Sequence, residues 1–95
     1  MIKIVRIAKT AIKQLKKSPM QVQFKFNAWV KMVSENGLEN VRHISGFHDE
    51  GLKGKLKGIR SIRLNDQWRA FYIIGNDDEI NFIEVSEVTP HAYKQ

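Results

Sequence analysis

Apolar and polar positions along the first part of the chain follow two different periods. Residues 2–7 place Lys3 between Ile2 and Ile4 and are rich in β-branched side chains, which predicts a short strand. From Ala8 to Lys17 the apolar side chains instead recur on one helical face, and Ser18-Pro19 ends that segment. A strand followed by a helix is therefore expected at the amino terminus.

The strongest periodic signal lies between Pro19 and Gly37. Apolar residues there follow the series i, i+4, i+7, i+8, i+11, namely Val22, Phe26, Trp29, Val30 and Val33. Pro19 suits the first turn of a helix, and Asn36-Gly37 supplies a stop. Each of those apolar side chains contributes about 1.5 to 3 kcal/mol when fully buried, so this helix must lie against an apolar surface.

The second half of the chain predicts a sheet that provides this surface. Residues 58–64 place Arg60, Ile62 and Leu64 on one side of a strand and Ser61 and Arg63 on the other. Residues 67–74 and 80–88 predict two further strands, joined by a hairpin loop at 75–78. Helices followed by hairpin-linked strands imply an α+β fold, with helices on one face of the sheet and the other face available for function.

Length and composition narrow the class of protein. A chain of 95 residues predicts one domain, 1–95, and the absence of Cys excludes disulfides and thiolate chemistry. The first ten residues fit neither a signal peptide nor a membrane span, so we expect a cytoplasmic protein with no membrane partner. The formal net charge of +6 indicates a polyanionic partner.

The positive charge is concentrated in residues 51–69, where Asp66 is the sole acidic residue. The six cations of this basic segment are Lys53, Lys55, Lys57, Arg60, Arg63 and Arg69. Residues 38–44 are expected to add a helical turn, and the glycine-rich stretch that follows, up to residue 57, predicts a long ordered loop. In an extended chain two of the three lysines would border one groove, although plain solvated charge explains them equally simply.

Two common site types are excluded by spacing. Leu56 follows Gly54-Lys55 where a phosphate loop needs a hydroxyl, and three scattered histidines without Cys do not make a metal motif. Two arginines, Arg63 and Arg69, lie in predicted strands among apolar neighbours, where guanidinium groups suit phosphate oxygens. A structural salt bridge from Arg69 to Glu84 or Asp66 is the alternative for that residue.

The carboxyl-terminal residues suggest acid–base chemistry. Pro90 ends strand pairing, so His91 and Tyr93, two positions apart, project to the same side at the sheet edge. Histidine gains and loses a proton near neutral pH, which suits a general acid or base. A surface role near the terminus is the alternative for His91.

The order of these motifs resembles a known family. The stretch GFHDEGLKGKLKGIRSIRLNDQWRAFYII, with EVSEVTPHAY after it, is similar to the RelE/HigB/YoeB superfamily of bacterial toxin ribonucleases over about residues 44 to 93. The resemblance implies a microbial-ribonuclease-like fold, with two amino-terminal helices packed on a small, mainly antiparallel sheet. It also implies a toxin of a type II toxin–antitoxin system that needs no metal or cofactor and cleaves mRNA in the ribosomal A site. A cognate antitoxin would block it, and operator DNA would be bound only through the toxin–antitoxin complex.

The same resemblance assigns roles to residues. Glu50 matches the general base of YoeB-like members, with His48 as an alternative base, and His91 matches the general acid. Tyr93 matches the tyrosine that orients or stacks the substrate. The residues that match positions gripping the RNA backbone and stabilising the transition state are Lys53, Lys55, Arg63 and Arg69. Of these, Arg63 and Arg69 are predicted to be catalytic, and the predicted RNA-binding residues are Lys53, Lys55, Lys57, Arg60 and His48.

This sequence departs from the family pattern at two positions. Ala92 stands where an acidic residue is usual, and Gly51 stands where proline is common, which would loosen the loop that carries Glu50. A catalytically silent nucleic-acid-binding or antitoxin-binding module of the same fold is therefore the alternative to an endoribonuclease. The two differ in product, because only the enzyme leaves a 2′,3′-cyclic phosphate on cut RNA.

Overall fold

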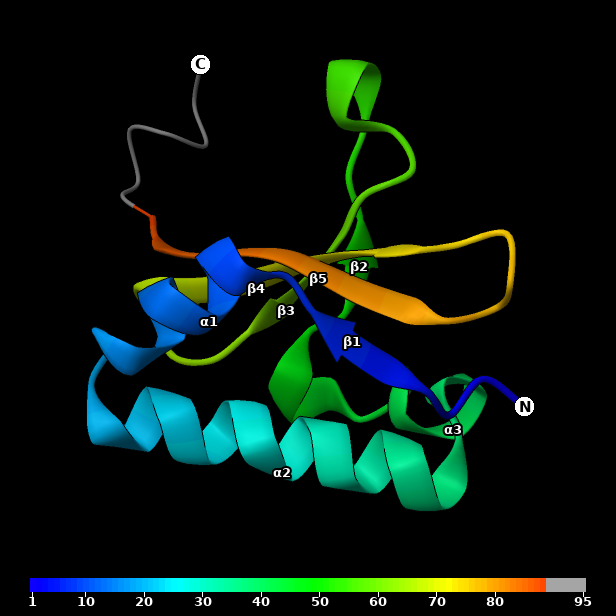
Figure 1. Cartoon of the computed structure of the whole chain (residues 1–95), viewed down its shortest axis with the longest axis horizontal. Helices are drawn as coiled ribbons and strands as arrows, with labels where there is room; N and C mark the ends of the chain where they lie inside the picture. The colour runs from blue at the N-terminus through cyan, green and yellow to red at the C-terminus, as the bar shows by residue number, and fades with distance from the viewer. Residues whose placement is uncertain (89–95) are drawn as a thin grey trace.

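A five-stranded sheet with a long helix across one face forms the centre of the computed structural model, which describes residues 1–88 (Figure 1). The elements in chain order are β1 (Val5–Ile7), α1 (Lys9–Lys16), α2 (Met20–Asn36), α3 (Leu38–Val41), the 3₁₀ turn η1 (Ser45–Phe47), β2 (Glu50–Gly51), the 3₁₀ turn η2 (Gly54–Leu56), β3 (Arg60–Arg63), β4 (Trp68–Ile74) and β5 (Ile80–Glu87). Figure 1 shows α2 along one side of the sheet and the segment that contains η2 rising on the other side. The predicted α+β architecture is confirmed.

The sheet is mixed but mainly antiparallel, as expected. Its strand order is β1-β5-β4-β3-β2, and β1 pairs with β5 in parallel while every other pair is antiparallel. The turn between β3 and β4 has a local cause, because the Asn65 side chain accepts hydrogen bonds from the backbone N–H groups of Gln67 and Trp68, both at 2.8 Å. This turn fixes how β4 folds back on β3.

The predicted apolar stripe of α2 forms the core. Val22, Phe26, Trp29 and Val33 are completely buried, whereas Val30 is only partly buried at the edge of the core. The stripe packs on the sheet through aromatic pairs, with ring centroids 4.7 Å apart for Phe26 and Phe82 and 5.4 Å apart for Trp29 and Tyr72. The face of the sheet that carries Tyr72 and Phe82 is therefore the face under α2.

Helix α1 protects the part of β5 that β1 leaves unpaired. β1 pairs only with residues 80–82, and the chain then turns into α1 after the Ala8 N–H donates to the Phe82 carbonyl at 2.9 Å. Further along β5, the Gln14 side chain accepts the Val85 N–H at 2.8 Å. A side-chain amide thus replaces a missing strand at this edge.

The segment between α3 and β3 differs from the expected loop. The helical turn predicted after Gly37 is present as α3, but residues 50–51 add an edge strand that sequence analysis missed, with Glu50 opposite Ser61 and Gly51 opposite Arg60. The expectation that the lysines follow an extended chain is wrong. Gly54 adopts φ +66°, and the backbone N–H of Lys57 donates to the Gly54 carbonyl at 3.1 Å, so η2 is a tight turn.

Candidate active site

Strand register places three of the predicted site residues on one face of the sheet. One cross-strand row contains Glu50, Ser61, Phe71 and Glu84, and the neighbouring row on the same side contains Arg63, Arg69 and Ser86. Residues directly opposite each other in an antiparallel ladder project to the same face, and so do residues two apart on a strand. The row between them, Ile62, Ala70 and Val85, is buried toward α2. Glu50, Arg63 and Arg69 therefore share the face turned away from α2, called the open face below.

Two arginines lie directly opposite each other on the open face. Arg63 and Arg69 are Cα partners, an arrangement of like charges that is unfavourable unless acceptors compensate it. Nη1 of Arg69 donates to the Trp68 carbonyl at 3.0 Å and to the Asn65 carbonyl, and Arg69 is only 8% exposed. Nε of Arg63 is buried and has no hydrogen-bond partner within residues 1–88. The Arg63 guanidinium is therefore not fully saturated by hydrogen bonds within these residues.

Neither arginine is consumed by an ion pair in the described part of the chain. The alternative salt bridge from Arg69 to Glu84 or Asp66 is not formed between those residues, because the guanidinium turns to the backbone of the β3–β4 turn instead. Arg63 is half-buried and lies directly opposite Arg69. Positive charge is thus fixed in position on two central strands of the sheet.

A histidine and a carboxylate lie together at the edge of the same face. His48 ends η1 in a left-handed conformation, φ 46°, and its Nε2 lies 3.5 Å from Oε2 of Glu50. Their side chains are 55% and 49% exposed, so both are open to solvent and to a ligand. Either group can accept a proton from a hydroxyl placed between them, so both Glu50 and His48 remain candidates for the general base.

Between them in the sequence, Asp49 points the opposite way and anchors the segment. Its side chain is completely buried, and Oδ1 accepts a hydrogen bond from Nε of Arg60 at 2.9 Å and lies 2.8 Å from Nη2 in an ion pair. Oδ2 accepts the Tyr72 hydroxyl at 2.6 Å. Because successive side chains of an extended segment alternate, the inward Asp49 turns Glu50 outward onto the open face. A two-residue strand is thereby fixed by a side chain as well as by backbone pairing.

The Asp49 network also sets the ionisation of its partners. Burial acts to lower the pKa of Arg60, but the Asp49 carboxylate outweighs it and leaves that pKa raised. Burial, together with the hydrogen bond to Asp49, raises the pKa of Tyr72. Both groups therefore stay protonated at neutral pH, with Arg60 as a cation whose charge is compensated from within the fold.

The basic segment does not act as one surface in the structure. Arg60 lies on the side of the sheet turned to α2 and pairs with Asp49, apart from Arg63 and Arg69. The three lysines, Lys53, Lys55 and Lys57, are exposed and lie within or next to η2. Figure 1 shows this segment on the side of the sheet opposite α2. RNA binding by these four residues stays a prediction. His91 and Tyr93 lie outside the described residues, so their positions relative to Glu50 and Arg63 also stay predictions.

Several solved toxins share this architecture. YafQ from E. coli superimposes with a TM-score of 0.71 at 15% identity, over 98% of this chain and 99% of that one. RelE of the RelE–RelB complex from Pyrococcus horikoshii gives 0.68 at 23% identity, over 92% and 96% of the two chains. The YoeB dimer from Staphylococcus aureus gives 0.64 at 20% identity, over 94% and 100%. This chain has the RelE-type toxin fold. No protein-family model and no curated protein sequence matches it.

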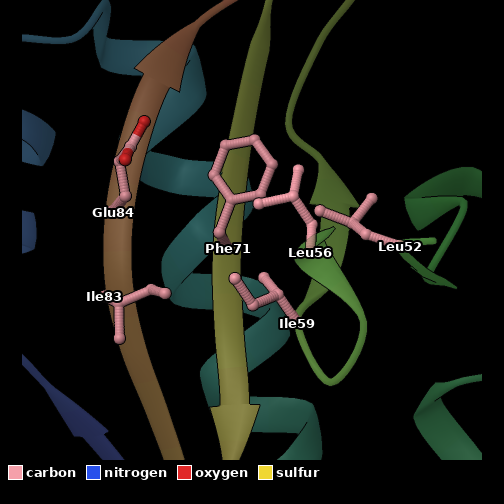
Figure 2. Close-up of a pocket in the computed structure, with 6 residues that line it drawn as sticks. All are labelled: Leu52, Leu56, Ile59, Phe71, Ile83 and Glu84. Carbon is pink, nitrogen blue, oxygen red and sulfur yellow. The ribbon is translucent and has the colours of Figure 1, made fainter. Parts of the chain in front are cut away.

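The RelE-type fold of this chain also carries a pocket on its open face that sequence analysis missed. It has a volume of about 170 Å³ and is lined by Leu52, Leu56, Ile59, Phe71, Ile83 and Glu84 (Figure 2). The alternation of residues 67–74 already places Phe71 on the same side of its strand as Arg69, which was the available signal. The part of the pocket formed by the η2 segment could not be predicted from the sequence, because it depends on how that segment folds over the sheet.

The described residues contain neither a cluster of metal-binding side chains nor a membrane-spanning helix. Within residues 1–88, His, Asp and Glu side chains form no group of three or more that could hold a metal ion. No helix in that part of the chain is long and apolar enough to cross a membrane.

Proposed function

We propose that this chain is the toxin of a type II toxin–antitoxin pair and acts as a metal-independent endoribonuclease on mRNA in the ribosomal A site. Two observations support the proposal. The fold is that of RelE, YafQ and YoeB toxins, and the residues to which the sequence resemblance gives catalytic roles include three that share the open face: Glu50, Arg63 and Arg69. The shared face is the observation that carries the proposal.

The proposed reaction is attack of a ribose 2′-OH on the adjacent phosphate. It forms a 2′,3′-cyclic phosphate and releases a 5′-OH, so it requires a base at the attacking oxygen and an acid at the leaving oxygen. Glu50 is the proposed base, with His48 at 3.5 Å as its alternative, and His91 is the proposed acid. DNA lacks the attacking hydroxyl and is not cleaved.

The arginine pair is the proposed electrostatic component. Negative charge grows on the phosphate oxygens as the 2′-oxygen attacks, and donors already fixed in place stabilise it without reorganisation. Arg63 provides a guanidinium that forms no ion pair within residues 1–88, and Arg69 adds a second directly opposite. In the proposed complex Tyr93 orients the substrate, and Lys53, Lys55 and Lys57 contact the backbone outside the reacting linkage.

The proposed partners follow from the same comparison. RelE from P. horikoshii was solved in complex with RelB, and YafQ from E. coli in complex with DinJ. A cognate antitoxin is accordingly proposed for this chain, which would bind operator DNA only through that complex. The proposed site of action is the cytoplasm, where translating ribosomes present their A-site codons.

The proposal is tested by inducing the protein in bacteria and mapping the 5′ ends of mRNA. Native protein is expected to create new ends inside translated codons. Arg63→Gln is expected to lower their rate of appearance by about 10²- to 10³-fold, the usual effect of removing one transition-state donor. Arg6→Gln is the matched control, because Arg6 pairs with Glu79 on the edge strand β1, which β5 and β4 separate from Arg63.

Three results would contradict the proposal. Intact mRNA during growth arrest by native protein would exclude cleavage and favour a silent binding module. Unchanged cleavage by Arg63→Gln would remove the arginine pair from the mechanism. Full activity of both Glu50→Gln and His91→Gln would leave the reaction without its acid and base.

A further inference from the structure

The pocket on the open face combines an aromatic ring with a carboxylate. Phe71 lies between Ile83 and Glu84 on one side and Leu52, Leu56 and Ile59 on the other (Figure 2). Phe71 and Glu84 belong to the same cross-strand row as Glu50. The pocket is therefore part of the face that carries the candidate active site.

A β-bulge creates the polar side of this pocket. Phe71 pairs with Glu84 but Tyr72 pairs with Phe82, so the register skips Ile83. Ile83 and Glu84 are both exposed, whereas Phe82 and Val85 on either side of them are buried. The bulge thus brings the apolar side chain of Ile83 and the acidic side chain of Glu84 to the same side of the pocket. Within residues 1–88 the Glu84 carboxylate makes no ion pair or side-chain hydrogen bond.

The apolar side of the pocket is only partly closed. Leu52 and Leu56 seat the η2 segment on the sheet, yet Leu56 remains 52% exposed and Ile83 37% exposed. A purely structural cluster under a loop would bury such side chains more fully. Apolar surface therefore remains for a flat ligand that stacks on Phe71.

From this geometry we infer that the pocket binds an RNA base that carries an exocyclic amino group, namely adenine, cytosine or guanine, in preference to uracil. The inference rests on the proposed function, because it places the base of a nucleotide whose neighbouring phosphate lies at Arg63 and Arg69. Those arginines are one row away on the same face, about 7 Å along the strands. Bases stack on aromatic rings regardless of sequence, so Phe71 supplies affinity.

Glu84 supplies the discrimination. A carboxylate is only an acceptor, and it pairs well with the amino group of cytosine or adenine. Uracil has no amino group, and its single donor, N3–H, lies between two carbonyl oxygens that a carboxylate repels. An aliphatic side chain of a protein partner would fill the apolar part of the pocket but leave the carboxylate without a donor, which is why a base fits better.

The test uses the full-length protein and 2′-O-methyl hexanucleotides of adenine, cytosine or uracil, which have no free 2′-OH and cannot be cleaved. Binding is measured by fluorescence anisotropy, and contact with the pocket by the amide chemical shifts of Phe71 and Glu84. We expect the adenine and cytosine strands to bind about tenfold more tightly than the uracil strand. The Glu84→Gln variant should lose this preference, whereas Glu87→Gln, on the same strand with its side chain on the other face, should keep it.

Removal of the ring tests the stacking contact separately. Phe71→Ala is expected to weaken binding of the adenine and cytosine strands about 5- to 100-fold. Phe24→Ala is the matched control, because Phe24 is 70% exposed on α2, on the other side of the sheet. Far-ultraviolet circular dichroism of all four variants establishes that each is folded.

The outcomes separate this inference from the proposed function. Equal affinity for the three strands, a preference that survives Glu84→Gln, or amide shifts of Phe71 and Glu84 that do not respond to any strand would overturn the inference even if mRNA is cleaved in cells. Selective binding that disappears in Glu84→Gln would support it even if no cleavage occurs. Binding of an antitoxin, but of no oligonucleotide, at Phe71 would assign the pocket to a protein partner instead.

Discussion

Replacing Asp49 with Asn is the sharpest test of how the fold holds its candidate base. The native carboxylate is completely buried, accepts hydrogen bonds from Nε of Arg60 and from the Tyr72 hydroxyl, and forms an ion pair with Nη2 of Arg60. Asn keeps the shape but loses the charge, and its amide group turns two donors toward partners that are themselves donors. The substitution therefore leaves Arg60 without its counter-ion and at least one buried donor without an acceptor.

The size of the effect follows from these contacts. Removing one member of a buried ion pair typically costs about 3 to 5 kcal/mol. Here the Arg60 side chain is 25% exposed, so water recovers part of that loss, and the Asn carbonyl still accepts one bond. We expect the free energy of unfolding to fall by about 2 to 4 kcal/mol, which corresponds to a decrease in Tm of about 10 to 25 °C for a domain of this size.

Urea unfolding followed by tryptophan fluorescence and circular dichroism measures this loss. Asp66→Asn is the matched control, since Asp66 is exposed in the β3–β4 turn, and it should change stability by less than about 0.5 kcal/mol. A loss below about 1 kcal/mol in Asp49→Asn would show that the network is solvated and does not anchor the segment. A loss of cleavage in Asp49→Asn that exceeds the unfolded fraction would indicate that Asp49 also positions Glu50.

Two further predictions concern the same fold. Because the pKa of Tyr72 is raised, the folded protein keeps a proton that the unfolded chain releases near pH 10, so the stability from this group is complete below pH 10 and falls as the pH rises above it. Tyr72→Phe should therefore make the free energy of unfolding, measured by denaturation, fall less steeply with pH above 10. An unchanged dependence on pH would contradict the raised pKa. Gln14→Ala leaves the Val85 N–H of β5 without its acceptor and should lower the free energy of unfolding by about 1 to 2 kcal/mol. Hydrogen exchange at the Val85 amide should become faster. Exchange as slow as in the native protein would show that another group covers this edge.

Periodic segments of the chain were predictable because their burial is repeated over many residues. The stripe of α2 from Val22 to Val33 and the alternation in residues 58–64 each contain enough buried positions to fix their element and orientation. The shared face of Arg63 and Arg69 was predictable in the same way, since the short turn at Asn65 sets the register of their strands. Local patterns sufficed wherever neighbouring residues determine the geometry.

Features that depend on distant partners were not predictable. Strand β2 has only two residues among glycines and exists because Asp49 reaches Arg60 and Tyr72. Arg60 shows the same effect: strand alternation already separates it from Arg63, but the sequence does not reveal that the buried Asp49 compensates its charge. The bulge at Ile83 is equally invisible in the sequence, as it is a property of the pairing of two strands.

The parallel pairing of the first strand with the last has a consequence for synthesis on the ribosome. Val5 lies opposite Ile80, so β1 has no strand to pair with until residues 80–82 have been translated. The same late segment provides Phe82, the ring on which Phe26 and Trp29 pack. A nascent chain that is still attached at residue 70 thus lacks both a finished sheet and a filled interior, and Arg69 gains its partner on β5 only after residue 86 has been translated.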